Sequence, residues 1–600
     1  MEVKATQYPR ILSIATLILL TACSNAPFAE REKKEAPSTI NLTTTAHVQG
    51  QANDGGQHNL VQQPVNIGAP LPASPPPAMQ SGRMMAAKTS KGVLEGTAVG
   101  LRAPMPLRET TYEGETQRSS PLAFDRESYN ALNENPLVVT ANDPLSTFSI
   151  DVDTASYSNI RRFLNTGALP PPGAVRIEEM INYFSYSYKE PQEGPLAITT
   201  EIGPCPWRPE NTLIRIGLKA KDLAPEKIPP SNLVFLVDVS GSMNQANKLP
   251  LLQQSISMLV DQMTGRDRIA IVTYAGSDRV VLPPTGGDKG AEIKAAIATL
   301  SSGGATHASS GIKTAYGLAR QSFMPGANNR IILASDGDFN VGVTSRDELE
   351  RLVAKERESG IYLTVLGFGM GNYHDDTMEI LADKGNGNYS YIDSLLEARK
   401  VLVKERTSTL FTLARDVKLQ VEFNPAHVAA YRLIGYENRT LADEDFHDDK
   451  KDAGEIGLGH TVTALYELYP VGSTAIPKVD SLKYQKISQT AGVAGELLTV
   501  KLRYKPLESQ ESVLQSHPVT VTRSTLNETS DDFRFAAAVA GFGMLLRHPE
   551  PPAALGYPLL LELAKNSRGK DPEGNRSEFL RLLETAEMLS KYQKNKPAKG

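Results

Sequence analysis

The chain has 600 residues, a length that corresponds to about four domains of roughly 150 residues each. Lysine and arginine number 63 against 68 aspartates and glutamates, and a net charge of −5 argues against a nucleic-acid-binding protein, which would present a basic face. Forty per cent of the residues are hydrophobic and 22% are charged, so the chain can bury large cores. The two cysteines, Cys23 and Cys205, exclude a disulfide-rich scaffold and cysteine-rich zinc or iron–sulfur sites.

The first 23 residues have the pattern of a secretory signal. Lys4 and Arg10 precede an apolar run over residues 11–20, which is too short to span a membrane by itself. The run leads into Leu-Thr-Ala-Cys23, which resembles the bacterial lipobox, and the resemblance implies that Cys23 carries lipid. Serine instead of aspartate follows the cysteine, which by resemblance to the sorting rule of enteric bacteria favours the outer membrane. We therefore expect a lipid-anchored cell-envelope protein, and an ordinary secreted signal is the alternative.

Residues 24–140 are expected to form a disordered linker behind this signal. The segment contains Gly- and Gln-containing stretches and six prolines between positions 64 and 77, and no helix or strand period persists in it. Four further units are predicted: an N-terminal flanking domain over 141–230, an α/β domain over 231–413, a β-rich domain over 414–525, and a C-terminal helical region with a tail over 526–600.

The N-terminal flanking domain is predicted to contain strands and helices in alternation. Strands are expected at 146–150 and at 213–218, where apolar and polar side chains alternate, and helices at 155–164 and 176–184. The acidic pair Asp151 and Asp153 stands directly before the first of these helices. We expect Asp153 or Thr154 to cap that helix, and metal binding by the acidic pair is the alternative.

Continuous apolar strands alternate with amphipathic helices in the segment 231–413. The strands are predicted at 233–237, 268–274, 331–334 and 362–366, and the helices at 249–263, 291–300, 310–323, 346–358 and 395–413. Strands that are apolar on both faces and alternate with helices indicate a doubly wound, mostly parallel α/β sheet.

After residue 415 the sequence pattern again predicts short strands. They are predicted at 417–423, 428–433, 461–468, 497–504 and 519–522, followed by helices at 532–546 and 577–592. Together with the strand at 213–218 they suggest one β-sandwich that the α/β unit interrupts, and a separate second β-domain is the alternative.

Oxygen-bearing side chains follow three segments of the predicted α/β sheet. The first apolar strand ends in Asp238-Val-Ser240-Gly-Ser242, a glycine pair leads to Thr306 at a helix start, and Asp336 follows the strand at 331–334. Ligands collect beyond the carboxyl ends of such strands. Three hydroxyls and two carboxylates suit a hard cation with oxygen ligands, Mg²⁺ or Mn²⁺, rather than zinc.

This combination resembles the von Willebrand factor type A domain and its metal-ion-dependent adhesion site, over residues 231–413. The resemblance implies a metal held by Ser240, Ser242 and Thr306, with Asp238 and Asp336 acting directly or through water. It also implies an open coordination position that an Asp or Glu side chain of a protein partner fills. His307 is expected to solvate the start of the helix. Residues 146–157, 176–184 and 531–540 are similar to the flanking regions of bacterial lipoproteins that bear this domain.

Binding, and not catalysis, is therefore the predicted function. The sequence contains no Gly-x-Ser-x-Gly elbow, no His-Glu-x-x-His helix and no Walker-type phosphate loop. One alternative is an envelope scaffold that binds through its β-rich region and has a non-essential metal site. A magnesium-dependent hydrolase is the weakest alternative, because a metal with an open position can activate water.

Overall fold

The structure is a computed structural model that describes residues 127–304, 308–337, 346–371, 373–476, 495–507, 509–548, 551–552 and 554–595. All of these belong to one unit of internal contacts, Glu113–Gly600. The predicted signal with Cys23, the predicted linker as far as residue 126, and both Thr306 and His307 lie outside the described residues. None of the described helices has the length and apolar character needed to cross a bilayer.

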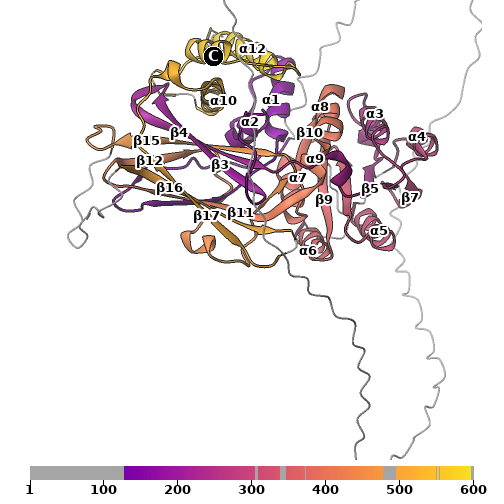
Figure 1. The fold of residues 1–600 in the computed structure, drawn as a ribbon. Helices are drawn as coiled ribbons and strands as arrows, with labels where there is room; N and C mark the ends of the chain where they lie inside the picture. Colours follow the sequence, from indigo (N-terminus) through magenta and orange to yellow (C-terminus); the bar gives the residue numbers. More distant parts are fainter. Residues whose placement is uncertain are drawn as a thin grey trace, which may run out of the picture. The chain divides into compact units, whose positions relative to one another are not determined.

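A six-stranded sheet with helices on both faces forms the α/β unit (Figure 1). Its strand order is β10-β9-β8-β5-β6-β7, parallel except for the antiparallel pair β6/β7. The strands are β5 (Ser231–Asp238), β6 (Arg268–Tyr274), β7 (Asp278–Gly286), β8 (Asn328–Ser335), β9 (Ile361–Phe368) and β10 (Tyr389–Ile392). The predicted doubly wound, mostly parallel sheet is confirmed.

The sequence of β5 shows why this sheet is covered on both sides. Leu233, Phe235 and Val237 pack with α3 (Leu249–Val260), α4 (Gly290–Ala298) and α8 (Leu395–Arg399). Val234 and Leu236, which point to the other face, pack with α5 (Ala308–Gln321), α6 (Arg346–Arg357) and α7 (Asp375–Lys384). Successive side chains of a strand point to opposite faces, so a continuous apolar run serves two cores.

The last helical stretch of the α/β unit differs from the single helix predicted over 395–413. It is broken into α8, a π-helical turn η5 (Lys400–Lys404) and α9 (Arg406–Leu410), and Thr412 already begins β11 (Thr412–Phe423). A π-helical turn adds a residue to the helical spiral and rotates the next helical segment about the axis. Its apolar positions Val401 and Leu402 still reach the core beneath α3, which explains the helical period in the sequence.

Segments that precede and follow the α/β unit in the sequence together form a sandwich of two antiparallel sheets (Figure 1). One sheet has the order β1-β12-β15-β4-β3 and the other β13-β2-β11-β16-β17, with β14 beside β11. The strands that precede the α/β unit are β1 (Val138–Val139), β2 (Leu145–Ser149), β3 (Leu196–Cys205) and β4 (Arg208–Ala220). Those that follow β11 are β12 (Val428–Ile434), β13 (Thr440–Leu441), β14 (Gly454–Gly457), β15 (Thr461–Pro470), β16 (Glu496–Pro506) and β17 (Val513–Thr520).

Pairing across the insertion makes this sandwich one discontinuous structure. Strand β4 pairs with β15, where Ile216 lies opposite Ala464, and β2 pairs with β11, where Phe148 lies opposite Leu419. The inward side chains of both sheets form a single core that includes Phe148, Ile216 and Leu419. The predicted interrupted β-sandwich is confirmed, and the alternative of a separate second β-domain is wrong.

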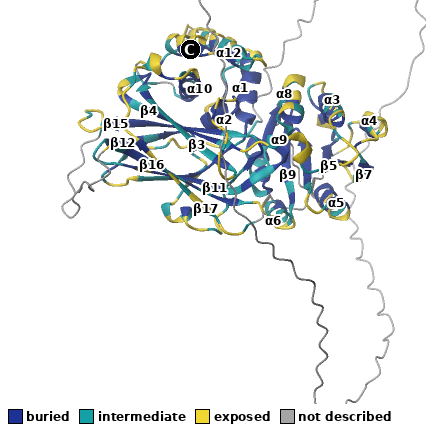
Figure 2. Cartoon of the chain, viewed as in Figure 1, coloured by how far each residue is buried: buried dark blue, intermediate teal, exposed yellow. Residues whose placement is uncertain are grey.

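Five helices pack on the outer face of the first sandwich sheet. They are α1 (Ala155–Asn165), α2 (Ile177–Asn182), α10 (Asp531–Arg547), α11 (Tyr557–Asn566) and α12 (Asn575–Asn595). Leu213 of β4 and Leu465 of β15 point into this helical core, one residue away from Ile214 and Ala464, which face the sandwich core. Figure 2 shows that buried residues lie along the strands of both sheets and along the helices that cover them. Cys205 is a buried free thiol in this layer.

The predicted N-cap position of α1 is confirmed for Thr154, whereas Asp153 does not cap the helix. Thr154 is the N-cap residue but makes no side-chain capping bond, and the Ser156 N–H is bound by the Glu179 carboxylate. Asp153 accepts a hydrogen bond from the Tyr389 N–H of β10 at 2.7 Å. Asp153 therefore connects the flanking region to the α/β unit, a long-range role that local sequence spacing does not reveal.

Candidate metal centre

The carboxylate of Asp238 lies where three neighbouring strands end. Asp238 is the last residue of β5 and is fully buried. Its Oδ1 accepts the Ser240 N–H at 2.9 Å, and its Oδ2 accepts the hydroxyls of Ser335 at 3.0 Å and Tyr274 at 3.3 Å. Ser335 ends β8 and Tyr274 ends β6, the two strands beside β5 in the sheet. The site predicted at the carboxyl-terminal ends of the strands is thus built around the Asp238 side chain.

The two serines of the motif turn their hydroxyls toward each other. Ser240 Oγ lies 3.0 Å from Ser242 Oγ, and Ser240 is buried whereas Ser242 is exposed. The turn that leads to Thr306 lies beside them, because the Gly241 N–H donates to Gly304 O at 3.2 Å and the Gly303 N–H to Val239 O at 2.7 Å. The structure thus brings together the first and second segments of the predicted site as far as residue 304.

Asp336 supplies the second carboxylate, directly after β8. It is 2% exposed, and its Oδ2 accepts a hydrogen bond from Lys248 Nζ at 2.9 Å. Gly337 follows with φ +88°, and a Cβ atom there would lie 2.6 Å from the His374 nitrogen. The turn after Asp336 therefore needs glycine, both for its backbone conformation and for its close approach to the loop before α7.

Three residues that contact the two carboxylates were not predicted from the sequence: Ser335 and Tyr274 on Asp238, and Lys248 on Asp336. Lys248 directly precedes α3, at the helix N-terminus, where the helix dipole disfavours a cation. Local sequence spacing does not reveal its partner, because Asp336 lies 88 residues further along the chain.

Burial shapes the electrostatics of the site. The pKa of Asp238 is raised to about 6, mainly by burial and also by the charge of Asp336, while hydrogen bonds from Ser240 and Ser335 oppose the rise. Burial beside Asp238 also raises the pKa of the Tyr274 hydroxyl. Two carboxylates that are buried close together favour the binding of a cation between them, and the ammonium group of Lys248 already supplies one positive charge.

The donor set fits a hard divalent cation. The described side chains at the site are two serine hydroxyls and two carboxylates, which are oxygen ligands of the kind that Mg²⁺ and Mn²⁺ prefer. The ammonium group of Lys248 stands as a cation against Asp336, which shows that this carboxylate is placed to hold positive charge. The assignment of Asp238, Ser240, Ser242, Thr306 and Asp336 as metal ligands stays a prediction.

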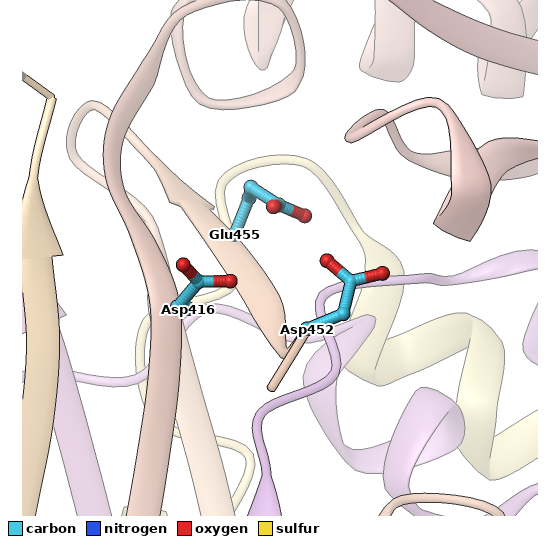
Figure 3. Close-up of side chains that lie close together, drawn as sticks. All are labelled: Asp416, Asp452 and Glu455. Atoms are coloured by element: carbon cyan, nitrogen blue, oxygen red, sulfur yellow. The ribbon is translucent and has the colours of Figure 1, made fainter. Parts of the chain in front are cut away.

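A second group of acidic side chains lies at the base of β11 (Figure 3). Oxygens of Asp416, Asp452 and Glu455 lie within 4.8 Å of one another. Lys505 Nζ contacts Asp416 at 2.7 Å and Arg357 contacts Asp452 at 2.8 Å, and burial raises the pKa of Glu455. This group is balanced by cationic side chains, and we assign no metal to it.

Comparisons with known proteins agree with the fold. Residues 232–404 match the profile of the von Willebrand factor type A domain, residues 408–589 that of the C-terminal region of the uncharacterized protein YfbK, and residues 123–215 one described as von Willebrand factor. Uncharacterized protein YfbK of Escherichia coli K12 is 45% identical over 469 residues, which are 76% of this chain and 81% of YfbK. Uncharacterized protein sll0103 of Synechocystis is 28% identical over 31% of this chain and 43% of its own length.

Two solved structures are also similar to parts of the chain. A von Willebrand factor type A protein from Catenulispora acidiphila aligns with a TM-score of 0.36 and 15% identity, covering 64% of this chain and 89% of its own. Proximal thread matrix protein 1 from the mussel byssus, in a structure described as having a zinc-occupied MIDAS motif, aligns with a TM-score of 0.26 and 22% identity over 31% and 46%. The predicted resemblance is confirmed by the sequence matches: the chain belongs to the family of bacterial von Willebrand factor type A domain proteins that includes E. coli YfbK.

Proposed function

We propose that this protein is a lipid-anchored envelope module that binds an acidic side chain of a protein partner through a divalent metal at its type A domain. The observation that carries this proposal is the arrangement at the end of β5. Two serine hydroxyls meet 3.0 Å apart beside the buried carboxylate of Asp238, and Asp336 directly follows the neighbouring strand β8.

In this proposal Ser240, Ser242 and Thr306 hold the metal, and Asp238 and Asp336 support it directly or through water. The metal is Mg²⁺ or Mn²⁺, and when bound it supplies an electrophilic centre with a position for a carboxylate oxygen. Ser242, which is exposed, lies on the side from which a partner approaches. The backbone turns at Gly241 and Gly303, hydrogen-bonded to their neighbours, keep the ligand-bearing segments in register.

Binding is favoured over catalysis by the way the two carboxylates are used. Asp238 is fully buried and accepts three hydrogen bonds, and Asp336 is paired with Lys248. A general base must reach the proton that it abstracts, and neither carboxylate is placed for this. Both instead keep the site in shape around a cation.

The cellular place of the protein is part of the same proposal. Cys23 would carry the lipid, the envelope would be the compartment, and the outer membrane the favoured membrane. Support comes from the apolar run over 11–20 and from the Leu-Thr-Ala-Cys23 sequence that ends the signal.

Capture from envelope extract tests the proposed function. The chain from residue 24 onward serves as bait with Mg²⁺, with EDTA, and as the variant Ser242→Ala, and the captured proteins are identified by mass spectrometry. We expect a partner that is captured with Mg²⁺ and lost both with EDTA and with Ser242→Ala. Ser257→Ala is the matched control, because its hydroxyl bonds to Gln253 O within α3.

Equal capture under all conditions would contradict the metal bridge and would transfer the binding role to the β-sandwich. Calorimetric titration with Mg²⁺, Mn²⁺ and Zn²⁺ separately shows whether the wild-type site holds a metal at all. The titration also decides which of the three ions binds best.

A further inference from the structure

Lys248 is a buried cation in direct contact with a carboxylate of the candidate metal centre. Its side chain is 4% exposed, and its ammonium group lies 2.9 Å from Asp336 Oδ2. The aliphatic stem passes over Gly369, where an added Cβ would lie 2.1 Å from Lys248 Cε and where the backbone has φ +79°. The loop after β9 thus leaves a place for the lysine stem, which fixes the position of its charge.

A charge at this position is costly to the fold. Burial disfavours an ammonium ion, and the N-terminus of α3 adds an unfavourable dipole. A neutral hydrogen-bond donor could also orient Asp336. The chain instead places a full positive charge there, which changes the net charge of the site that a ligand beside Asp336 meets.

We propose that Lys248 sets the net charge of the loaded metal centre and thereby selects a carboxylate as its ligand. This inference rests on the proposed function. Asp238 and Asp336 together cancel the two charges of a divalent metal, and Lys248 leaves one positive charge in excess. The lysine therefore weakens the binding of the metal itself and strengthens the binding of an anionic ligand to the metal. Lys248 acts through Asp336 and is a positioning residue.

Substitution of Lys248 by methionine tests this inference, because methionine keeps most of the length of the stem and removes the charge. The chain from residue 24 is titrated with Mn²⁺ by calorimetry at pH 7.5. The Mn²⁺-loaded protein is then titrated with acetate, a simple carboxylate probe, and the loss of metal-bound water is followed by water proton relaxation. We expect Mn²⁺ to bind about tenfold tighter or more to Lys248→Met, because the variant lacks the buried positive charge that lies against Asp336 and repels a cation at the same centre.

Acetate is expected to bind the Mn²⁺-loaded variant several-fold more weakly than the wild type. Lys248→Gln, a second neutral variant, should shift both affinities in the same directions and serves if the methionine variant does not fold. Lys294→Met is the matched control: Lys294 pairs with Asp261 at 2.5 Å on the exposed face of α3 and α4, so its loss should change neither affinity.

The opposite movement of the two affinities is a result that a structural role would not produce. If both affinities fall together, or if neither changes in the two neutral variants, the inference is overturned while the proposed function stands. If wild-type protein binds no Mn²⁺, the proposed function itself fails and this inference fails with it.

Discussion

Glu178 is a buried carboxylate whose charge should make the stability of the fold depend on pH. It lies in α2, has no exposed surface, and its Oε2 accepts the Tyr436 N–H at 2.9 Å. Its Oε1 has no hydrogen-bond partner among the described residues. Burial raises the pKa of Glu178 from 4.5 to about 7, Glu437 adds to the rise, and Arg547 opposes it. The substitution Glu178→Gln removes the charge and keeps the shape.

The sign of the pH dependence follows from which state, folded or unfolded, binds the Glu178 proton more tightly. Between pH 4.5 and about 7 the folded state binds this proton and the unfolded state releases it, so the free energy of unfolding falls as the pH rises. The contribution is fully present below pH 4.5 and is lost as the pH passes 7. At 1.36 kcal/mol per pKa unit, the shift corresponds to roughly 3 kcal/mol of stability lost by pH 8.

Urea unfolding at pH 5 and pH 8 measures this difference. We expect wild type and Glu178→Gln to agree within about 1 kcal/mol at pH 5, where the wild-type carboxyl is protonated, and the variant to be about 1–3 kcal/mol more stable at pH 8. Comparing the two proteins at each pH cancels the other titrating groups. Hydrogen exchange at the Tyr436 amide, which Glu178 binds, gives a local readout that does not require two-state unfolding.

The same stability difference at both pH values would refute the reasoning, because a packing effect does not depend on protonation. Glu210→Gln, at an exposed position in β4, is the control and should follow wild type at both pH values.

Two further predictions concern the metal centre and the anchor. Gly337→Ala should lower the free energy of unfolding by about 2 kcal/mol or more and weaken Mn²⁺ binding, because its Cβ would lie 2.6 Å from the His374 nitrogen at φ +88°. Gly326→Ala, also at positive φ but with open space around its Cβ, should cost only the backbone strain and leave the Mn²⁺ titration unchanged. Cys23→Ser should release the protein from the membrane fraction and abolish incorporation of labelled fatty acid; a variant that stays membrane-bound would contradict the proposed anchor.

Local sequence patterns predicted four of the six strands of the α/β sheet, β5, β6, β8 and β9, because these strands are buried on both faces. In β5, Val234 and Phe235 are both fully buried, so the strand reads as an uninterrupted apolar run. The partly exposed edge strand β7 and the short strand β10 were not predicted. Strand β3 was not predicted, since most of its residues are only half-buried and Gly203 and Pro204 interrupt its far end. Strand β17 was placed too late, at 519–522, because its residues are mostly exposed and carry no apolar alternation.

Contacts between distant segments could not be predicted from periodicity. The shared sandwich of the strand at 213–218 with the later strands was predicted, but its pairing with β15 and the register of that pairing were not. The same limit applies to the metal centre: the positions of Asp238 and Asp336 at strand ends were predictable, whereas the contact between Lys248 and Asp336 requires the fold. The sequence around Asp153 suggested a helix cap for the same reason, since its partner, the Tyr389 N–H, lies far along the chain.

The flanking regions hold the α/β unit by buried ion pairs, and this bears on where a partner can bind. Arg161 of α1 pairs with Asp393 and Glu397 at the start of α8, and Arg176, at the start of α2, pairs with Asp375 at the start of α7. Loss of one member of such a pair leaves a buried charge uncompensated, at a cost of about 3–5 kcal/mol. These carboxylates of the α/β unit are therefore already used within the chain. Ser242, by contrast, is exposed at the carboxyl-terminal ends of the strands, so the proposed metal centre is accessible from outside on that side.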